Sequence, residues 1–167
     1  MNIGLTLAGL GISLVILYAN ARTWWKAGKD PKTLGPFGAG FTLGALATVC
    51  TGGLLGFLAG CTVQATNGTG ARVVPGSTGT PSQPLAQGSL GQLTPEGGLV
   101  VFLLAAGVTL AWRAAGKDVK KRMAGGLLCG ACLCATAGFA SLLDGLPQAA
   151  NGIGMAIRLA AEGQGVL

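Results

Sequence analysis

The chain has 167 residues, of which 50% are hydrophobic and only 10% are charged. An ordinary soluble domain has about 25% charged residues. Aromatic residues make up 5% and histidine is absent, so the sequence lacks both the large core residues and the polar surface of a soluble protein. The composition excludes most soluble enzymes and favours a non-enzymatic integral membrane protein with a formal net charge of +6.

Four apolar stretches have about the length that a membrane-spanning helix needs, roughly 20 residues for a hydrocarbon core of about 30 Å. They cover residues 3–21, 37–60, 97–112 and 123–143. The third is the shortest, but Thr94, Pro95 and Glu96 before it suit an N-cap and a first helical turn. The sequence therefore predicts an all-α integral membrane protein whose four transmembrane helices form two tandem helical hairpins.

Basic residues fall into two short clusters between these stretches. Nine of the eleven belong to them: Arg22, Lys26, Lys29 and Lys32, then Arg113, Lys117, Lys120, Lys121 and Arg122. Because positively charged loops stay in the cytoplasm, we expect a multi-pass protein of the cell membrane with both termini outside. The same topology puts Trp24, Trp25 and Trp112 at the inner membrane interface.

The two clusters share a repeated segment. Residues 24–32 read WWKAGKDPK and residues 112–120 read WRAAGKDVK, with six of nine positions identical. We interpret this as a duplicated hairpin in which the shared glycine ends one helix and the shared aspartate caps the next. A second interpretation is contact with anionic lipid or another polyanion, through Lys26, Lys29, Lys32, Arg113, Lys117, Lys120, Lys121 and Arg122. The two interpretations are compatible.

Small residues recur at every fourth position in two of the apolar stretches. The series are Gly40, Gly44, Thr48, Gly52, Gly56 and Gly60, and Gly126, Gly130, Cys134 and Gly138. Such faces let helix backbones approach closely in a membrane, so we expect these glycines to pack helices. The pattern leaves open whether the packing is within one chain or between subunits.

The cysteines suggest two further hypotheses. Cys129, Cys132 and Cys134 have a spacing reminiscent of a redox or metal site, but without histidine or a second pair they are expected to be packing residues. Residues 58–61 read LAGC, which resembles a bacterial lipobox with Cys61 as the lipidated residue. The alternative is that Gly60 and Cys61 simply end a helix. No cofactor is expected, except a bound phospholipid.

The two predicted hairpins cover residues 1–60 and 95–143, and two further segments lie outside them. Residues 61–94 are rich in Gly, Ser, Thr, Pro and Gln and are expected to form an extracytoplasmic loop. Residues 144–167 are expected to hold a short interfacial helix, with apolar residues at 149, 153, 157 and 160. Arg158 and Glu162 would then face water.

Paired apolar helices around a basic turn, with small-residue faces, resemble the pilins of conjugative type IV secretion systems. The chain departs from that family in having two hairpins. The resemblance implies a structural subunit that assembles with itself into a ring or filament, contacts anionic lipid, and forms a conduit for nucleic acid or protein. A weaker likeness to proteolipid rotor subunits fails because residues 37–60 and 123–143 hold no carboxylate. A pore-forming protein such as a phage holin, and a membrane anchor of a larger complex, remain alternatives.

Overall fold

The computed structural model describes residues 4–50 and 52–163. Within these residues the fold is all-helical, with two isolated antiparallel bridges in place of strands. The helices are α1 (Leu7–Lys26), α2 (Pro31–Val49), α3 (Gly53–Thr78), α4 (Pro95–Ala114), α5 (Lys117–Cys134), α6 (Ala137–Leu142) and α7 (Gly145–Ala161).

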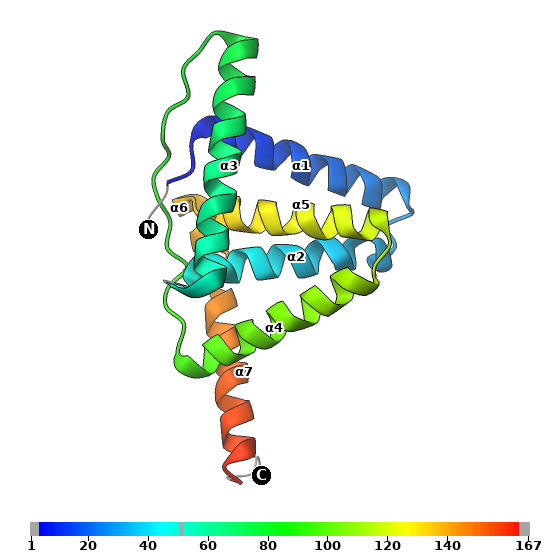
Figure 1. Cartoon of the computed structure of the whole chain (residues 1–167), viewed down its shortest axis with the longest axis vertical. Helices are drawn as coiled ribbons and strands as arrows, with labels where there is room; N and C mark the ends of the chain where they lie inside the picture. The colour runs from blue at the N-terminus through cyan, green and yellow to red at the C-terminus, as the bar shows by residue number, and fades with distance from the viewer. Residues whose placement is uncertain (1–3, 51, 164–167) are drawn as a thin grey trace.

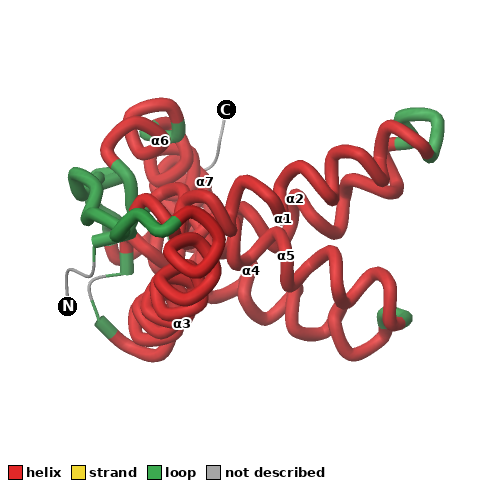
Figure 2. The backbone as a smooth tube through the Cα atoms, turned by 90° about the horizontal axis from the view of Figure 1, so that it is seen from above, coloured by secondary structure: helices red, strands yellow, loops and turns green. Residues whose placement is uncertain are grey.

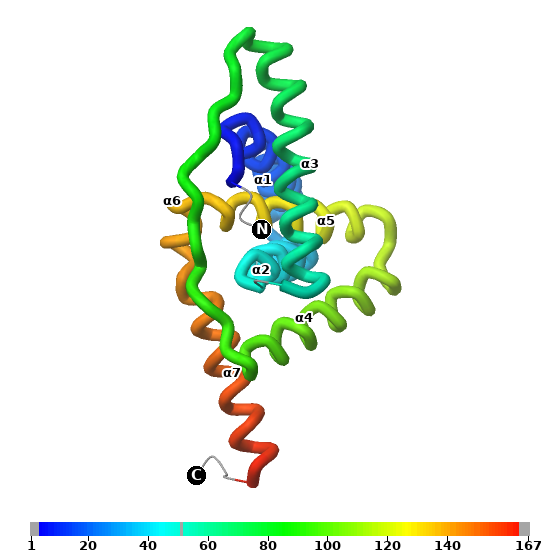
Figure 3. Tube along the Cα trace, turned by 60° about the vertical axis from the view of Figure 1, so that its left-hand side comes forward, coloured from blue at the N-terminus to red at the C-terminus, as the bar shows by residue number. Residues whose placement is uncertain are grey.

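Four of these helices lie side by side in one layer, in the order α1, α5, α2, α4 (Figure 1). Helices α1 and α4 run in one direction and α2 and α5 return, so the α1–α2 and α4–α5 turns lie at the same end. Helices α3 and α7 run across the opposite end, roughly perpendicular to the axes of the four helices (Figures 1 and 3). We call the end of the layer that carries the two turns the simple end, and the end that α3 and α7 cross the covered end.

Residues 79–94, which we call the strap, connect α3 to α4 along the covered end (Figure 3). The strap pairs with the segment before α1, because Leu7 N donates to Gln83 O at 2.8 Å and Leu85 N donates to Leu5 O at 2.9 Å. It thereby ties the start of the first helix to the second half of the chain.

The centre of the layer is a backbone contact between α2 and α5. A Cβ atom on Gly40 would collide with the carbonyl oxygen of Met123, and one on Gly44 with that of Leu127. The reverse collisions would occur from Gly126 onto Phe37 and from Gly130 onto Phe41. Only glycine permits this approach, so these four predicted packing glycines join the two halves within the chain.

The expected third span agrees with α4. Thr94 caps it by accepting a hydrogen bond from Gly97 N at 3.1 Å, and Pro95 and Glu96 occupy its first turn. Within the described residues, α4 is the one helix that is by itself long and apolar enough to cross a membrane, with a mean hydropathy of 1.7. The expected first span corresponds to α1, which begins later and continues through Trp24 and Trp25 to Lys26.

The prediction of one helix over residues 37–60 is wrong. Helix α2 ends at Val49, α3 begins at Gly53, and the two helices meet at an angle of 105°. The reason lies at the break: Gly52 is extended, and Gly53 has φ 72°, a left-handed conformation that residues with a side chain adopt only with strain. Helices α2 and α3 are apolar enough to cross a membrane only when taken together as a bent pair.

The prediction of one helix over residues 123–143 is also wrong. Helix α5 starts earlier, at Lys117, and ends at Cys134, and α6 follows after a break at Ala135 and Thr136. Thr136 is extended and its hydroxyl donates to Leu133 O at 2.7 Å, which competes with the helical hydrogen bonds.

The prediction of a loop over residues 61–94 is wrong for residues 61–78, which belong to α3. The polar composition of these residues wrongly suggests a loop. Their threonine hydroxyls are accommodated in the helix by hydrogen bonds to carbonyl oxygens one turn earlier, as from Thr66 Oγ1 to Thr62 O at 2.8 Å. The buried face of α3, with Val63, Thr66 and Gly70, packs against α1. Tertiary packing thus overrides a weak helix propensity.

The expected C-terminal helix is α7, which has 17 residues. It packs on the start of α4 through Pro147, Ala150 and Gly154. The apolar series expected from the sequence lies on another face and is exposed, with Ile153 at 54% and Ile157 at 39% relative exposure.

Candidate functional site

Both clusters of basic residues surround the two turns at the simple end of the layer (Figure 2). Lys120 and Arg122 are half-buried, and the other six predicted contact residues are exposed: Lys26, Lys29, Lys32, Arg113, Lys117 and Lys121. Within the described residues, none of these lysines takes part in an ion pair. This end of the layer is therefore a surface of net positive charge.

The first basic turn, residues 27–30, has the conformation that the sequence predicts. Gly28 has φ 71° and Lys29 has φ 62°, both in the left-handed region. Asp30 then caps α2, because its carboxylate accepts a hydrogen bond from Lys32 N at 2.9 Å. The Lys29 ammonium lies 4.8 Å from the centre of the Trp25 ring, which fixes one positive charge beside an aromatic face.

The second basic turn, residues 115 and 116, differs, so the predicted equivalence of the two turns is wrong in detail. Gly116 has φ −72° and is itself the N-cap of α5, while Asp118 lies inside the first helical turn. The reason is the residue after the shared AGKD segment. Pro31 disfavours a helical conformation at Asp30, whereas Val119 lets α5 begin two residues earlier in the segment.

Arg122, predicted to contact anionic lipid or another polyanion, is half-buried and makes a hydrogen bond within the chain. Its Nη1 atom donates to the carbonyl oxygen of Thr33 at 3.0 Å, which joins the first turn of α2 to α5. Hydrogen bonds from a guanidinium to a backbone carbonyl are stronger than neutral ones, so this arginine strengthens the contact between α2 and α5 near the two basic turns.

The predicted glycine series do not continue beyond the central contact. Gly52 and Gly138 have open space at their Cβ positions, and Gly52 and Gly60 no longer belong to α2. Gly56 packs closely against the carbonyl of Cys50, at the break between α2 and α3. The fourfold spacing in the sequence thus runs across two helix breaks.

An asparagine on α3 holds the start of α1. Asn67 Oδ1 accepts hydrogen bonds from the backbone N–H of Thr6 at 2.8 Å and from its hydroxyl at 3.0 Å. Asn67 Nδ2 donates to Gly4 O at 2.9 Å, and Thr6 Oγ1 caps α1 at Gly9 N at 3.2 Å. We call this set of bonds the first clamp.

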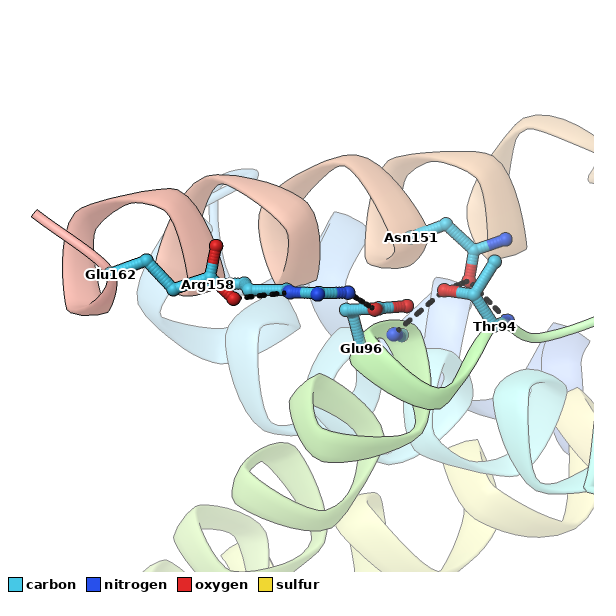
Figure 4. A network of polar contacts seen from close by, with 6 residues as sticks. Thr94, Glu96, Asn151, Arg158 and Glu162 are labelled. Atoms are coloured by element: carbon cyan, nitrogen blue, oxygen red, sulfur yellow. Dashed lines mark hydrogen bonds and ion pairs between the residues drawn. The ribbon is translucent and has the colours of Figure 1, made fainter. Parts of the chain in front are cut away.

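The same arrangement recurs in the second half of the chain. Asn151 Oδ1 on α7 accepts from Thr94 N at 3.0 Å and from Thr94 Oγ1 at 3.2 Å (Figure 4). Asn151 Nδ2 donates to Gln92 O at 3.1 Å, and Thr94 caps α4 at Gly97 N. This second clamp reproduces every bond of the first.

The duplication therefore extends from a hairpin to a three-helix unit. Residues 4–78 form unit 1 and residues 92–161 form unit 2, and the continuous helix α3 corresponds to α6 and α7 together. A sequence signal exists that the hairpin interpretation missed. Residues 65–70 read ATNGTG and residues 149–154 read AANGIG, with the clamp asparagine at the third position of each.

Unit 2 has an additional polar network beside its clamp. Arg158 binds Glu96 at 2.7 Å and Glu162 at 2.8 Å (Figure 4). The hydrogen bonds to Glu162 and then to Glu96 raise the pKa of the Arg158 guanidinium. Arg158 and Glu162 are exposed, as expected, and the network joins α7 to the first turn of α4.

The cysteines are divided between the interior and the surface. Cys129, Cys132 and Cys134 are buried, and the thiol of Cys132 donates to Thr66 Oγ1 at 3.3 Å. Cys61 is exposed in the middle of α3, so the expectation that Gly60 and Cys61 end a helix is wrong.

A groove of about 810 Å³ opens at the covered end of the layer. Its walls are the last turn of α2, the first half of α3, the C-terminal end of α5 and the strap residues 87–91. Every residue that lines it is uncharged, and six are glycines: Gly52, Gly53, Gly56 and Gly60, and from the strap Gly88 and Gly91.

The chain matches no protein family model, no curated protein and no solved structure.

Proposed function

We propose that the chain is a four-span membrane protein that serves as a structural, self-assembling subunit. The observation that carries the proposal is the common position of both basic turns, at one end of a layer of four helices. The positive-inside rule explains such a position directly, because charged turns of this kind stay in the cytoplasm.

The dimensions and outer surfaces of the layer support this topology. Its helices have 18 to 20 residues, or about 27–30 Å at 1.5 Å per residue. The two outer helices carry exposed apolar side chains: Leu14, Val15 and Tyr18 on α1, and Phe102, Leu103 and Leu110 on α4. Large exposed apolar faces suit a lipid environment. Helices α2 and α5 lie inside the layer, where glycine contacts replace apolar bulk.

In this topology the covered end of the layer is extracytoplasmic. Helices α3 and α7 would lie along the outer membrane surface, and both termini would be outside. The exposed Ile153 and Ile157 of α7 suit an interfacial helix.

The closed contact between the two units bears on the kind of assembly. Because the glycines of α2 and α5 pack backbone on backbone, a passage for a macromolecule between the units of one chain has no room. A pilin-like conduit for nucleic acid or protein would therefore run between several copies of the chain. The exposed lysines would contact anionic lipid headgroups or offset phosphate charge.

A membrane anchor of a larger complex is the second candidate. The uncharged groove at the covered end favours it, because this end faces the extracytoplasmic side in the proposed topology. A phage holin would also need membrane-spanning helices and self-assembly, so these two features suit a holin and a pilin-like subunit equally.

Cysteine labelling tests the topology. In a background without the native cysteines, Ala27→Cys and Gly116→Cys should resist an impermeant thiol reagent in intact cells, and Thr80→Cys should react. All three positions are exposed in the structure, so access depends on the membrane alone. Labelling of the first two positions from outside would contradict the proposal.

Charge removal tests the role of the basic end. Changing Lys29, Lys32, Lys117, Lys120 and Lys121 to Gln removes five charges and keeps both turns. We expect the variant to insert and to form the wild-type oligomer in mild detergent, but to lose bound anionic lipid or the transfer of a macromolecule. Unchanged function would show that these lysines set topology only.

A further inference from the structure

The outer face of α1 carries two cations close to the simple end of the layer. Helix α1 lies at the edge of the layer, so one face packs on α5 and α3 and the opposite face has no neighbouring helix among the described residues (Figure 1). Arg22 and Lys26 are one turn apart and exposed. Tyr18 and Val15, one and two turns earlier on the same face, are 68% and 65% exposed. An apolar surface therefore ends in a pair of positive charges.

These residues surround a shallow hollow of about 370 Å³ on the surface of α1. Its lining consists of six residues of this helix: Val15, Tyr18, Ala19, Arg22, Thr23 and Lys26. Ala19 has the smallest side chain of the six, so the longer side chains around it form the walls. The hollow thus has an apolar part, formed by Val15, Tyr18 and Ala19, and a cationic part next to it.

Neither cation has an acidic partner in the part of the chain that the structure describes, because the ion pairs there all belong to Arg158. Asp30, the nearest carboxylate in the sequence, caps α2 by accepting a hydrogen bond from Lys32 N. In the proposed topology, Arg22 lies one helical turn, about 6 Å, nearer to the membrane interior than Lys26, the last residue of α1. A cation at that depth on a lipid-facing surface is costly without an anion. The pair therefore calls for an anionic ligand.

The equivalent face of α4 in unit 2 lacks this pair. The clamp threonines are 88 positions apart, as are the repeated segments that begin at residues 24 and 112. At the same offset, Leu110 corresponds to Arg22 and Ala114 to Lys26. Both of these α4 residues are exposed and uncharged, although basic residues follow α4 as they follow α1. Neither the repeated unit nor the basic turn therefore requires the pair in α1, and a ligand accounts for it.

We propose that this hollow binds one anionic phospholipid of the cytoplasmic leaflet. The phosphate group would lie between Arg22 and Lys26, since a guanidinium binds phosphate oxygens through two parallel hydrogen bonds and an ammonium adds a point charge. The acyl chains would run along Tyr18 and Val15 toward the middle of the membrane. The inference rests on the proposed topology and deepens it. It assigns one lipid to one position of α1, in addition to the diffuse attraction of headgroups by the lysines of the turns.

Native mass spectrometry of the purified full-length protein in mild detergent tests the site. With equal amounts of phosphatidylglycerol and phosphatidylcholine added, the first lipid retained should be phosphatidylglycerol, at one molecule per chain. Changing Arg22 and Lys26 together to Gln should weaken its binding at least about tenfold. Changing Arg113 and Lys117 to Gln is the matched control, because it removes one arginine and one lysine from exposed positions at the other basic turn. That variant should retain the first lipid like wild type.

A second variant tests the hollow itself. Ala19→Leu fills it and leaves every charge in place, so it should also weaken the binding of the first phosphatidylglycerol. Ala111→Leu, the same change at an exposed position of α4, should not. An unchanged helical circular dichroism spectrum shows that each variant is folded. Wild-type binding by folded Ala19→Leu would contradict the proposal.

Three further results would overturn it. The first is equal retention of the two lipids by the wild-type protein. The second is an equal loss in both double variants, which would mean that the whole basic end attracts headgroups without a defined site. The third is displacement of the lipid by an excess of inorganic phosphate, which would assign the two cations to a soluble anion. Cysteine labelling reports on the topology separately, so a failed lipid site with residues 27 and 116 shielded from outside would leave the proposed function intact.

Discussion

Units 1 and 2 contain the same parts but differ in how far each part is packed. Helix α1 packs more extensively along α5 than its counterpart α4 packs along α2. The long surface helix is continuous in unit 1 and broken in unit 2, where the strap covers the break. The glycine contact and the clamps are nevertheless equivalent in both units.

The difference shows which features define the repeated unit. Bonds that recur in both copies, such as those of Asn67 and Asn151, fix the angle between the surface helix and the layer. Features that occur once, such as the Arg158 network and the strap contacts, adapt one unit to its place in the chain. Variants that change equivalent residues in the two units can separate these classes.

The largest effect is expected at the central contact. Gly44→Leu and Gly130→Leu should each lower the free energy of unfolding by at least about 3 kcal/mol, because a side chain there overlaps a backbone carbonyl that has no freedom to move. The two losses should be similar. Thermal unfolding in mild detergent measures both.

Gly38→Leu on α2 is the matched control, since its Cβ position has open space and its cost should stay below about 1 kcal/mol. A Gly44→Leu variant as stable as this control would contradict the described contact.

A smaller effect is expected at the clamps. Asn67→Ala and Asn151→Ala each remove two accepted hydrogen bonds and one donated bond, and should cost about 1–3 kcal/mol. Asn67→Ala should cost more, because its clamp is partly buried and the bonds of Asn151 are exposed. Hydrogen exchange at the N–H groups of Thr6 and Thr94 should accelerate in the respective variants. Unchanged exchange in both would refute the clamps.

The two basic turns should respond differently to the same substitution. Asp30→Ala removes a side-chain N-cap and should cost about 1 kcal/mol. Asp118→Ala removes only a charge in the first turn of α5 and should cost about 0.5 kcal/mol or less. Chemical denaturation of the two variants measures the difference, and equal losses would mean that both aspartates act alike.

The smallest effect is expected at Arg158. Arg158→Ala breaks two ion pairs of an exposed guanidinium and should lower the free energy of unfolding less than either clamp variant does. The loss should shrink in high salt, because salt screens exposed charges. A loss that is larger or independent of salt would show that α7 depends on this network rather than on its clamp and its packed face.

The sequence alone predicts the helical class, the position of α4 and the two basic turns, because apolar length and charge position are local properties. The glycine faces at Gly40, Gly44, Gly126 and Gly130 are also visible in the spacing. The helices against which these glycines pack cannot be predicted, since spacing does not distinguish contacts within a chain from contacts between chains.

The breaks and the surface helix depend on tertiary contacts. Gly52 continues the fourfold spacing, so the pattern conceals the end of α2. Thr136 is extended partly because the strap pairs with its neighbours, and these residues are distant in sequence. The polar helix α3 forms because it packs on α1, which its composition does not reveal.

The most direct measurement concerns the pairing of the two units in the full chain. A protease site inserted between Gly79 and Thr80, at the exposed end of α3, allows cleavage after folding. We expect the two pieces to stay together through size-exclusion chromatography in mild detergent, Gly44→Leu to separate them, and Gly38→Leu to leave them together. Separation of the pieces without any substitution, or cohesion that survives Gly44→Leu unchanged, would contradict this pairing.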